Sequence, residues 1–189
     1  MRGGDFKINL RELGYIIGLL HGDGYLYHDK KQRHYNIEFY LHSEKDKDIQ
    51  TYLIHLLKKL ELKPLIFKDK RFKCVRIRCR SKIFYTLFKK LKKKIISHKN
   101  FKLGFISGLI DAEGDIISKK WVRISNTNKN LINKVKRILK NLNINYRVKK
   151  IKQKQKNWSV VYRIYVPIEK LINMKSNSIK IRRALGIAG

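Results

Sequence analysis

Hydrophobic and polar residues alternate in several short stretches of the chain, and in other stretches apolar residues recur every three or four positions. Alternation is typical of strands with one buried face, whereas the longer spacing is typical of amphipathic helices. The alternating stretches are 33–41, 65–68, 72–80, 121–125, 146–151 and 158–166. The amphipathic stretches are 49–62, 83–91, 131–142 and 168–172. The pattern therefore predicts an α+β protein.

The order of these elements repeats, and a sequence motif repeats with it. Residues 13–24 read LGYIIGLLHGDG and residues 103–114 read LGFISGLIDAEG, with six of the twelve positions identical. Each copy is followed by two strands, a helix, two strands and a final helix. We therefore predict two αββαββα half-domains, 1–97 and 98–189, related by a pseudo-twofold axis. The next shared residues, Ser43-Glu44 and Ser125-Asn126, come eight residues later in the first copy, which indicates a longer first hairpin.

Small residues occupy every fourth position in both copies of the motif. They are Gly14, Gly18 and Gly22 in the first copy and Gly104, Gly108 and Ala112 in the second. A glycine inside a helix costs about 1 kcal/mol relative to alanine. Small residues in return let two helices approach more closely than the usual interaxial distance of about 8–10 Å. The matched spacing therefore predicts that the two motif helices pack on each other through Gly14, Gly18, Gly104 and Gly108.

Each motif helix ends in an acidic residue followed by glycine. The pairs are Asp23-Gly24 and Glu113-Gly114, and we expect each glycine to form a left-handed C-cap. If the helices pair about a twofold axis, the two carboxylates meet at one end of their interface. The helix dipole and the mutual repulsion of the acids both disfavour this arrangement. A divalent cation would offset both effects, and hard oxygen ligands suit magnesium.

The predicted strands have one apolar face and one face rich in basic, aromatic and amide side chains. A basic ribbon of this kind can enter the major groove of DNA, where arginine pairs with guanine and asparagine with adenine. We therefore expect two antiparallel sheets to form a saddle over double-stranded DNA. The side chains predicted to face DNA are His34, Asn36, Glu38, Tyr40, Arg76, Arg78, Arg80, Lys119, Trp121, Arg123, Arg147, Lys149, Arg163 and Tyr165.

The composition agrees with an anionic partner. The 189 residues include 46 Lys and Arg and 14 Asp and Glu, which gives a formal net charge of +32. Nucleic acid is the first candidate partner and a membrane surface the second, although an AT-rich gene would also enrich lysine. The hydrophobic content of 43% argues against a disordered polycation, and no apolar stretch is long enough to span a bilayer. Cys74 and Cys79 are expected to remain reduced, and no cysteine and histidine spacing suggests zinc.

The two motifs resemble the LAGLIDADG motif of homing endonucleases. The nine-residue motif aligns without gaps to 16–24 (IIGLLHGDG) and 106–114 (ISGLIDAEG), and the repeated elements extend the resemblance over about residues 10–181. The resemblance is to the single-chain, two-motif branch. It implies a monomer that cleaves both strands of a long, specific double-stranded DNA target and leaves 3′ overhangs.

The resemblance also implies the metal site. Asp23 and Glu113 would bind Mg²⁺, or another divalent cation such as Mn²⁺, together with the backbone carbonyls of Gly22 and Ala112. The metals would activate a water for in-line attack and stabilise the leaving 3′ oxygen.

Polar residues around the metal site complete the implied set. Glu44 and Asn126 map to the positions that orient water, although an amide is more usual at the position of Glu44. The assisting lysines map to Lys94, with Lys93 as an alternative, and to Lys175. His21 replaces the first acid of the motif, which the second copy keeps as Asp111.

Three other functions remain open. Some members of the family assist intron splicing as RNA-binding maturases, and a DNA-binding regulator could keep the fold without catalysis. Ribosomal-protein-like RNA binding would explain the charge but not the repeat. The retained Asp23 and Glu113 favour the nuclease, because binding alone does not require paired acids. Since neither end carries intein splicing residues, we expect an intron-encoded or free-standing protein, located in a prokaryotic cytoplasm or an organelle.

Overall fold

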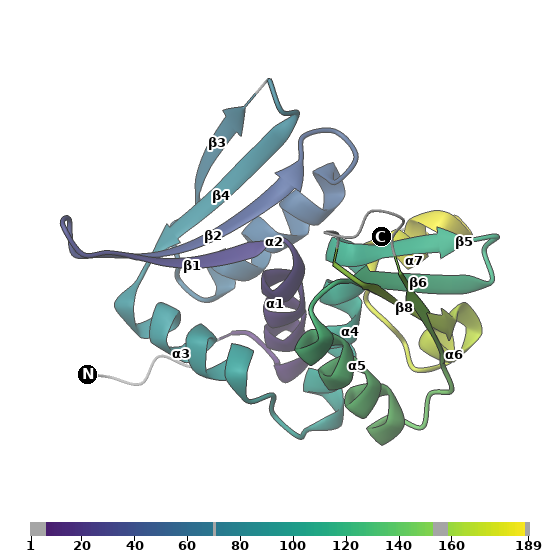
Figure 1. Ribbon diagram of the computed structural model, residues 1–189. Helices are drawn as coiled ribbons and strands as arrows, with labels where there is room; N and C mark the ends of the chain where they lie inside the picture. Colours follow the sequence, from purple (N-terminus) through teal and green to yellow (C-terminus); the bar gives the residue numbers. More distant parts are fainter. Residues whose placement is uncertain (1–6, 70, 153–158, 188–189) are drawn as a thin grey trace.

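Two halves share the order αββαββα, and the second half continues into a further short helix (Figure 1). The computed structural model describes residues 7–69, 71–152 and 159–187. The first half contains α1 (Leu10–Gly22), β1 (Gly24–Asp29), β2 (His34–His42), α2 (Lys47–Lys59), β3 (Leu65–Asp69), β4 (Cys74–Arg80) and α3 (Lys82–Lys93). The second contains α4 (Lys99–Glu113), β5 (Gly114–Ile117), β6 (Trp121–Asn126), α5 (Lys129–Asn141), β7 (Arg147–Ile151), β8 (Val161–Pro167), α6 (Ile168–Asn173) and α7 (Ile179–Leu185).

This order confirms the predicted α+β class and the two αββαββα halves. The short helix α7, with seven residues, was not predicted. The predicted boundary between residues 97 and 98 lies in the segment that joins α3 to α4, and the division into half-domains remains a prediction. Trp158, where the last alternating stretch begins, lies outside the described residues.

Each half forms a four-stranded antiparallel sheet. The strand order is β1-β2-β4-β3 in the first sheet and β5-β6-β8-β7 in the second. The register pairs Phe39 with Ile77 in the first and Ile124 with Ile164 in the second, so equivalent residues face the helices. The longer first hairpin is confirmed, since β1 and β2 have six and nine residues whereas β5 and β6 have four and six.

The apolar faces of both sheets join the helices in one continuous core. Ile37, Phe39 and Ile77 of the first sheet and Val122 and Val166 of the second are fully buried. In the part of the chain that the structure describes, no helix combines the length and the apolar character needed to cross a membrane.

Helices α1 and α4 lie side by side at the centre of the molecule, between the two sheets (Figure 1). A Cβ atom added at Gly18 would lie 2.1 Å from a backbone oxygen of α4, and one added at Gly108 would lie 2.0 Å from a backbone oxygen of α1. Additions at Gly14 and Gly104 would meet the facing backbone at 2.2 and 1.9 Å. The structure therefore places all four predicted interface glycines where no larger residue fits.

The glycines that follow the motif acids have a different role from the expected one. The prediction of a left-handed C-cap is wrong, because Gly114 has φ −92° and ψ 144° and Gly24 has no positive φ. Both residues begin a strand, and the chain turns back against its own helix at this point. A Cβ atom at Gly24 would lie 2.5 Å from Leu20 Cα, and one at Gly114 would lie 2.5 Å from Ile110 O. Close packing, and not backbone conformation, requires glycine here.

We predict that Gly18→Ala destabilises the fold. Alanine favours a helix by about 1 kcal/mol over glycine, but here its methyl group would overlap a backbone oxygen and force the two helices apart. We expect the free energy of unfolding to fall by about 3 kcal/mol, as measured by urea denaturation. Asn133→Ala, at an exposed position of α5, serves as the control. Equal stability of Gly18→Ala and the parent would contradict the tight helix interface.

Candidate active site and sheet surfaces

The C-terminal ends of α1 and α4 bring the two motif acids together. Asp23 caps α1, and its backbone N–H donates to Leu19 O at 3.0 Å. Glu113 is the last residue of α4. A Cβ atom at Gly22 would lie 2.4 Å from Ala112 Cβ and 2.8 Å from Glu113 Cγ. The residues predicted to offer carboxylates and carbonyls therefore meet where the helices end.

The electrostatics of this pair favour a bound cation. Burial, and after it the charge of Glu113, raises the pKa of Asp23 to about 7. Burial also raises the pKa of Glu113, and a hydrogen bond from Asn126 together with the charge of Lys180 opposes the shift. The charge of Asp46 raises the pKa of Asp23 further. Few positive charges or hydrogen-bond donors offset the cost of ionising these partly buried acids. A cation bound between the two carboxylates would therefore stabilise their charged forms.

The donor set fits magnesium bound jointly by the protein and a substrate. In the described residues no group of three or more His, Cys, Asp and Glu side chains could hold a metal by itself. Magnesium is usually held by one or two carboxylates, with waters and substrate phosphates as the other ligands. Asp23 and Glu113, with the carbonyls of Gly22 and Ala112, match that kind of site.

Lys180 is a site residue that the sequence did not reveal. It lies in the first turn of α7, and its Nζ donates to the carbonyls of Ala112 at 3.3 Å and Gly114 at 3.1 Å. Its charge lowers the pKa of both Asp23 and Glu113. The structure therefore places the ammonium group of Lys180 beside the acidic pair, on the side of the second half.

The first acid of the second motif explains why Lys180 is there. Asp111 is 1% exposed and accepts hydrogen bonds from Ser178 Oγ, from the N–H groups of Ile179 and Lys180, and from Tyr15 OH, at 2.6–2.9 Å. It therefore fixes the start of α7 against α4. In the first copy His21 takes this position, and burial, followed by the charges of Lys134 and Lys92, lowers its pKa to about 3.

The structure brings only one of the predicted peripheral residues to the pair. Asn126 Nδ2 donates to Glu113 Oε1 at 3.0 Å. Glu44 is exposed in a turn, where its own N–H donates to His42 Nδ1. The charge of Asp46, two residues further on, adds to that of Glu113 in raising the pKa of Asp23.

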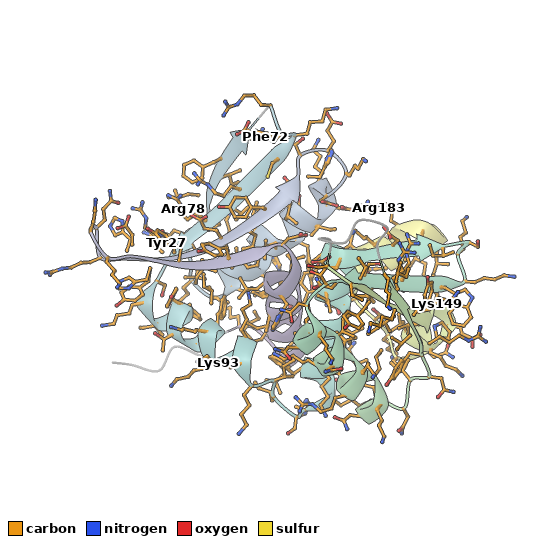
Figure 2. All side chains as sticks on the ribbon, viewed as in Figure 1. Tyr27, Phe72, Arg78, Lys93, Lys149 and Arg183 are labelled. Carbon is orange, nitrogen blue, oxygen red and sulfur yellow. The ribbon has the colours of Figure 1, made fainter. Side chains whose placement is uncertain are left out.

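The predicted lysines lie elsewhere. Lys175 is exposed, and its carbonyl accepts from Arg11 Nη1 at 3.0 Å, beside the N-terminal end of α1. That end is about 20 Å from Asp23, since α1 has 13 residues. Lys94 is exposed just after α3, and Lys93, labelled in Figure 2, lies on the outer side of the same helix end. The Lys175 carbonyl is thus held toward the end of α1 opposite the acidic pair, whereas Lys180 lies beside the pair, and the assisting role of Lys175 remains a prediction.

The outward face of the first sheet is more aromatic than predicted. Tyr25, Tyr27 and Phe67, which were not among the predicted residues, are 57%, 46% and 39% exposed on this face. The Arg76 guanidinium lies 4.6 Å from the Phe67 ring centroid. Tyr40 and Arg80 are exposed, and His34 and Arg76 are half-buried.

Two of the residues predicted to face DNA are buried on that face. Asn36 and Glu38 are each 5% exposed, because the register sets the large side chains of β1 and β4 on either side of them. Tyr27 and Arg80 flank Asn36, whose Oδ1 has no partner in the described residues. The prediction that these two side chains contact DNA directly is therefore wrong for the conformation seen here.

The outward face of the second sheet carries the charged side chains that were predicted. Arg123 Nη2 donates to Asp115 Oδ2 at 2.7 Å. Cation–π contacts connect two neighbouring pairs, Arg147 with Trp121 at 5.3 Å and Lys149 with Tyr165 at 5.8 Å. The remaining predicted residues are Arg163, half-buried on β8, and Lys119, exposed in the β5–β6 turn.

Two family models match the chain, one for each half. A model described as the WhiA LAGLIDADG-like domain matches residues 13–98, and a model described as a LAGLIDADG-like domain matches residues 100–184. An uncharacterized protein of Methanocaldococcus jannaschii is 32% identical over 162 residues, which cover 75% of this chain and 59% of that protein. The chain thus spans a little more than half the length of this relative.

Solved structures share the fold over nearly the whole chain. The homing endonuclease I-DmoI in complex with DNA and Ca is 25% identical with a TM-score of 0.72, and the match covers 95% of this chain and 98% of that chain. I-DmoI in complex with DNA and Mn is 27% identical with a TM-score of 0.67, over 91% and 98%. The N-terminal LAGLIDADG domain of DUF199/WhiA has a TM-score of 0.61 over 99% and 86%, and at 16% identity it shows similarity of fold alone.

The acidic pair predicts a pH-dependent stability in the absence of divalent metal. Because the pKa of Asp23 is raised to about 7, the folded chain retains a proton that the unfolded chain releases near pH 4. The free energy of unfolding should therefore decrease as pH rises from about 4 to 7, by about 1–2 kcal/mol after allowance for solvent screening. Asp23→Asn should weaken this dependence in urea denaturation with EDTA.

Glu61→Gln, at an exposed acid beyond the end of α2, is the matched control and should follow the parent. An Asp23→Asn variant whose stability changes with pH as much as that of the parent would contradict the assignment of the raised pKa.

Proposed function

The chain is a single-chain, two-motif member of the LAGLIDADG family, and we propose that it is a site-specific endonuclease that cuts both strands of a long double-stranded DNA target. The observation that carries this proposal is the pairing of Asp23 and Glu113 at the ends of two helices in direct backbone contact. An acidic pair is of no use for holding a phosphate backbone by charge, but it is suited to holding divalent cations against one.

The basic sheet faces support double-stranded DNA as the substrate. Both carry arginines on strands that alternate with buried residues, and the chain has a net charge of +32. I-DmoI, which shares the fold, is described in complex with DNA. Two such faces related by the pseudo-twofold axis would each cover one half-site, with the acidic pair between them.

Different residues of this chain would have different roles around the scissile phosphate. Asp23, Glu113 and the carbonyls of Gly22 and Ala112 would hold Mg²⁺ or Mn²⁺, which when bound supply an activated water and stabilise the leaving oxygen. Asn126 fixes the orientation of the Glu113 carboxylate through its 3.0 Å hydrogen bond. Lys180 balances part of the negative charge and holds the backbone on both sides of Glu113.

Several finer features belong to the same proposal. They are cleavage that leaves 3′ overhangs, action as a monomer, an origin within an intron, and a location inside a prokaryotic cell or an organelle.

A DNA-binding regulator without nuclease activity is the second candidate. It is favoured by one observation, which is that the first half matches the WhiA LAGLIDADG-like domain model. In the endonuclease the acidic pair would hold the metal for DNA cleavage, whereas in the regulator it would have no catalytic role.

The catalytic assignment predicts a separation of cutting from binding. Asp23→Asn and Glu113→Gln should each abolish cleavage of a cognate duplex in Mg²⁺, because one oxygen ligand becomes a neutral amide. Binding of the same duplex, measured by fluorescence anisotropy, should stay within a fewfold of the parent. Glu169→Gln, at an acid that is 72% exposed on α6, should cut normally. Normal cutting by both site variants would show that the acids are not catalytic.

The charge on the sheet faces predicts strong salt dependence of DNA binding. With roughly 10 phosphate contacts, a plot of log affinity against log salt concentration should have a slope near −9. Anisotropy titrations between about 50 and 200 mM salt measure this slope. A nearly flat plot would mean that the basic side chains lie outside the interface.

A further inference from the structure

A buried acid lies at the centre of the outward face of the first sheet. Glu38 is 5% exposed on β2, with Tyr25 of β1 and Arg78 of β4 as its register partners. Its Oε1 accepts from Arg78 Nε at 2.5 Å, and its Oε2 accepts from Tyr40 OH at 2.5 Å. Both carboxylate oxygens are therefore engaged, and burial keeps Glu38 itself from reaching a base.

The contacts of Glu38 determine how Arg78 is presented. Nε is used by the carboxylate, and in the described part of the chain the two terminal nitrogens of Arg78 make no hydrogen bond. The Arg78 guanidinium also lies 5.2 Å from the Phe67 ring centroid. The Arg78 side chain is 20% exposed. Glu38 contacts its Nε and Phe67 contacts the plane of its guanidinium, while the edge formed by the two terminal nitrogens is available to a ligand. Figure 2 shows Arg78 on the same sheet as Tyr27.

We propose that Glu38 is a positioning residue that holds Arg78 for the recognition of one guanine in the first half-site. The free terminal edge of an arginine matches the O6 and N7 acceptors of guanine in the major groove. A guanidinium already fixed by Glu38 loses less rotamer freedom when it binds the base. The inference deepens the proposed function, because it needs duplex DNA as the ligand, but it does not depend on cleavage.

The second sheet offers a natural comparison. Arg123 is paired with Asp115, but Asp115 is 57% exposed, and the pair uses both Nε and the terminal Nη2 of Arg123. One of the two terminal nitrogens is thus occupied, and the acid is accessible to water. Asp115→Asn is therefore a matched control, in which an acid–arginine pair is altered on the other face.

The test is selection of bound sites from a randomised duplex DNA library, with EDTA present so that cutting plays no part. The parent should prefer guanine at one position of the first half-site. Glu38→Gln, which keeps a hydrogen-bond acceptor for Tyr40 but removes the charge, should reduce that preference on the order of tenfold. Preferences at the other positions and the salt slope should be unchanged, because Arg78 keeps its charge. Asp115→Asn should leave the first half-site unchanged.

Arg78→Lys is the second variant, and it keeps the charge but lacks the planar edge. It should lose the same guanine preference as Glu38→Gln, and it decides the question if Glu38→Gln fails to fold by circular dichroism. Retention of the preference in either folded variant would overturn the inference while leaving the proposed nuclease intact. If the parent selects no duplex sequence at all, the inference and the proposed function fail together.

Discussion

The direct backbone contact between α1 and α4 determines how the two halves of the molecule are arranged. Gly18 and Gly108 each face a backbone oxygen of the other helix at a distance that excludes even a methyl group. This contact fixes the axis about which the two halves are related. It also decides that the two helix ends, and therefore Asp23 and Glu113, come together at one place between the sheets.

The same constraint makes the acidic pair electrostatically costly. Burial and the neighbouring carboxylate raise the pKa of Asp23 to about 7. The compensating groups come from the second half: Lys180 acts on both acids, and Asn126 donates a hydrogen bond to Glu113. The repeat is thus symmetric in fold but asymmetric in chemistry. Asp111 anchors α7 and so positions Lys180 beside the acidic pair. Its counterpart His21 is half-buried, and its ring packs edge-on against Phe105 of α4.

The sequence predicted those features that depend on local spacing. Helical and strand periods located most elements, and the matched glycines predicted the central helix contact. Other features depend on which side chains cover one another across strands. Alternation placed Asn36 and Glu38 on the correct face but could not show that larger neighbours bury them. Lys180 was not predicted because α7 is short and its position is set by Asp111, 69 residues away along the chain. The predicted lysine, Lys175, contacts Arg11 near the N-terminal end of α1, whereas the acidic pair lies at the C-terminal end.

The proposed function requires that the paired carboxylates form a metal site for hydrolysis of double-stranded DNA. The most direct measurement is sequencing of the DNA ends produced when the parent chain acts on a randomised duplex library with Mg²⁺, compared with EDTA. We expect paired breaks on both strands within one recurring sequence, with 3′ overhangs and only in Mg²⁺. Selective binding of a recurring sequence with no breaks in either condition would contradict it and would favour a DNA-binding regulator.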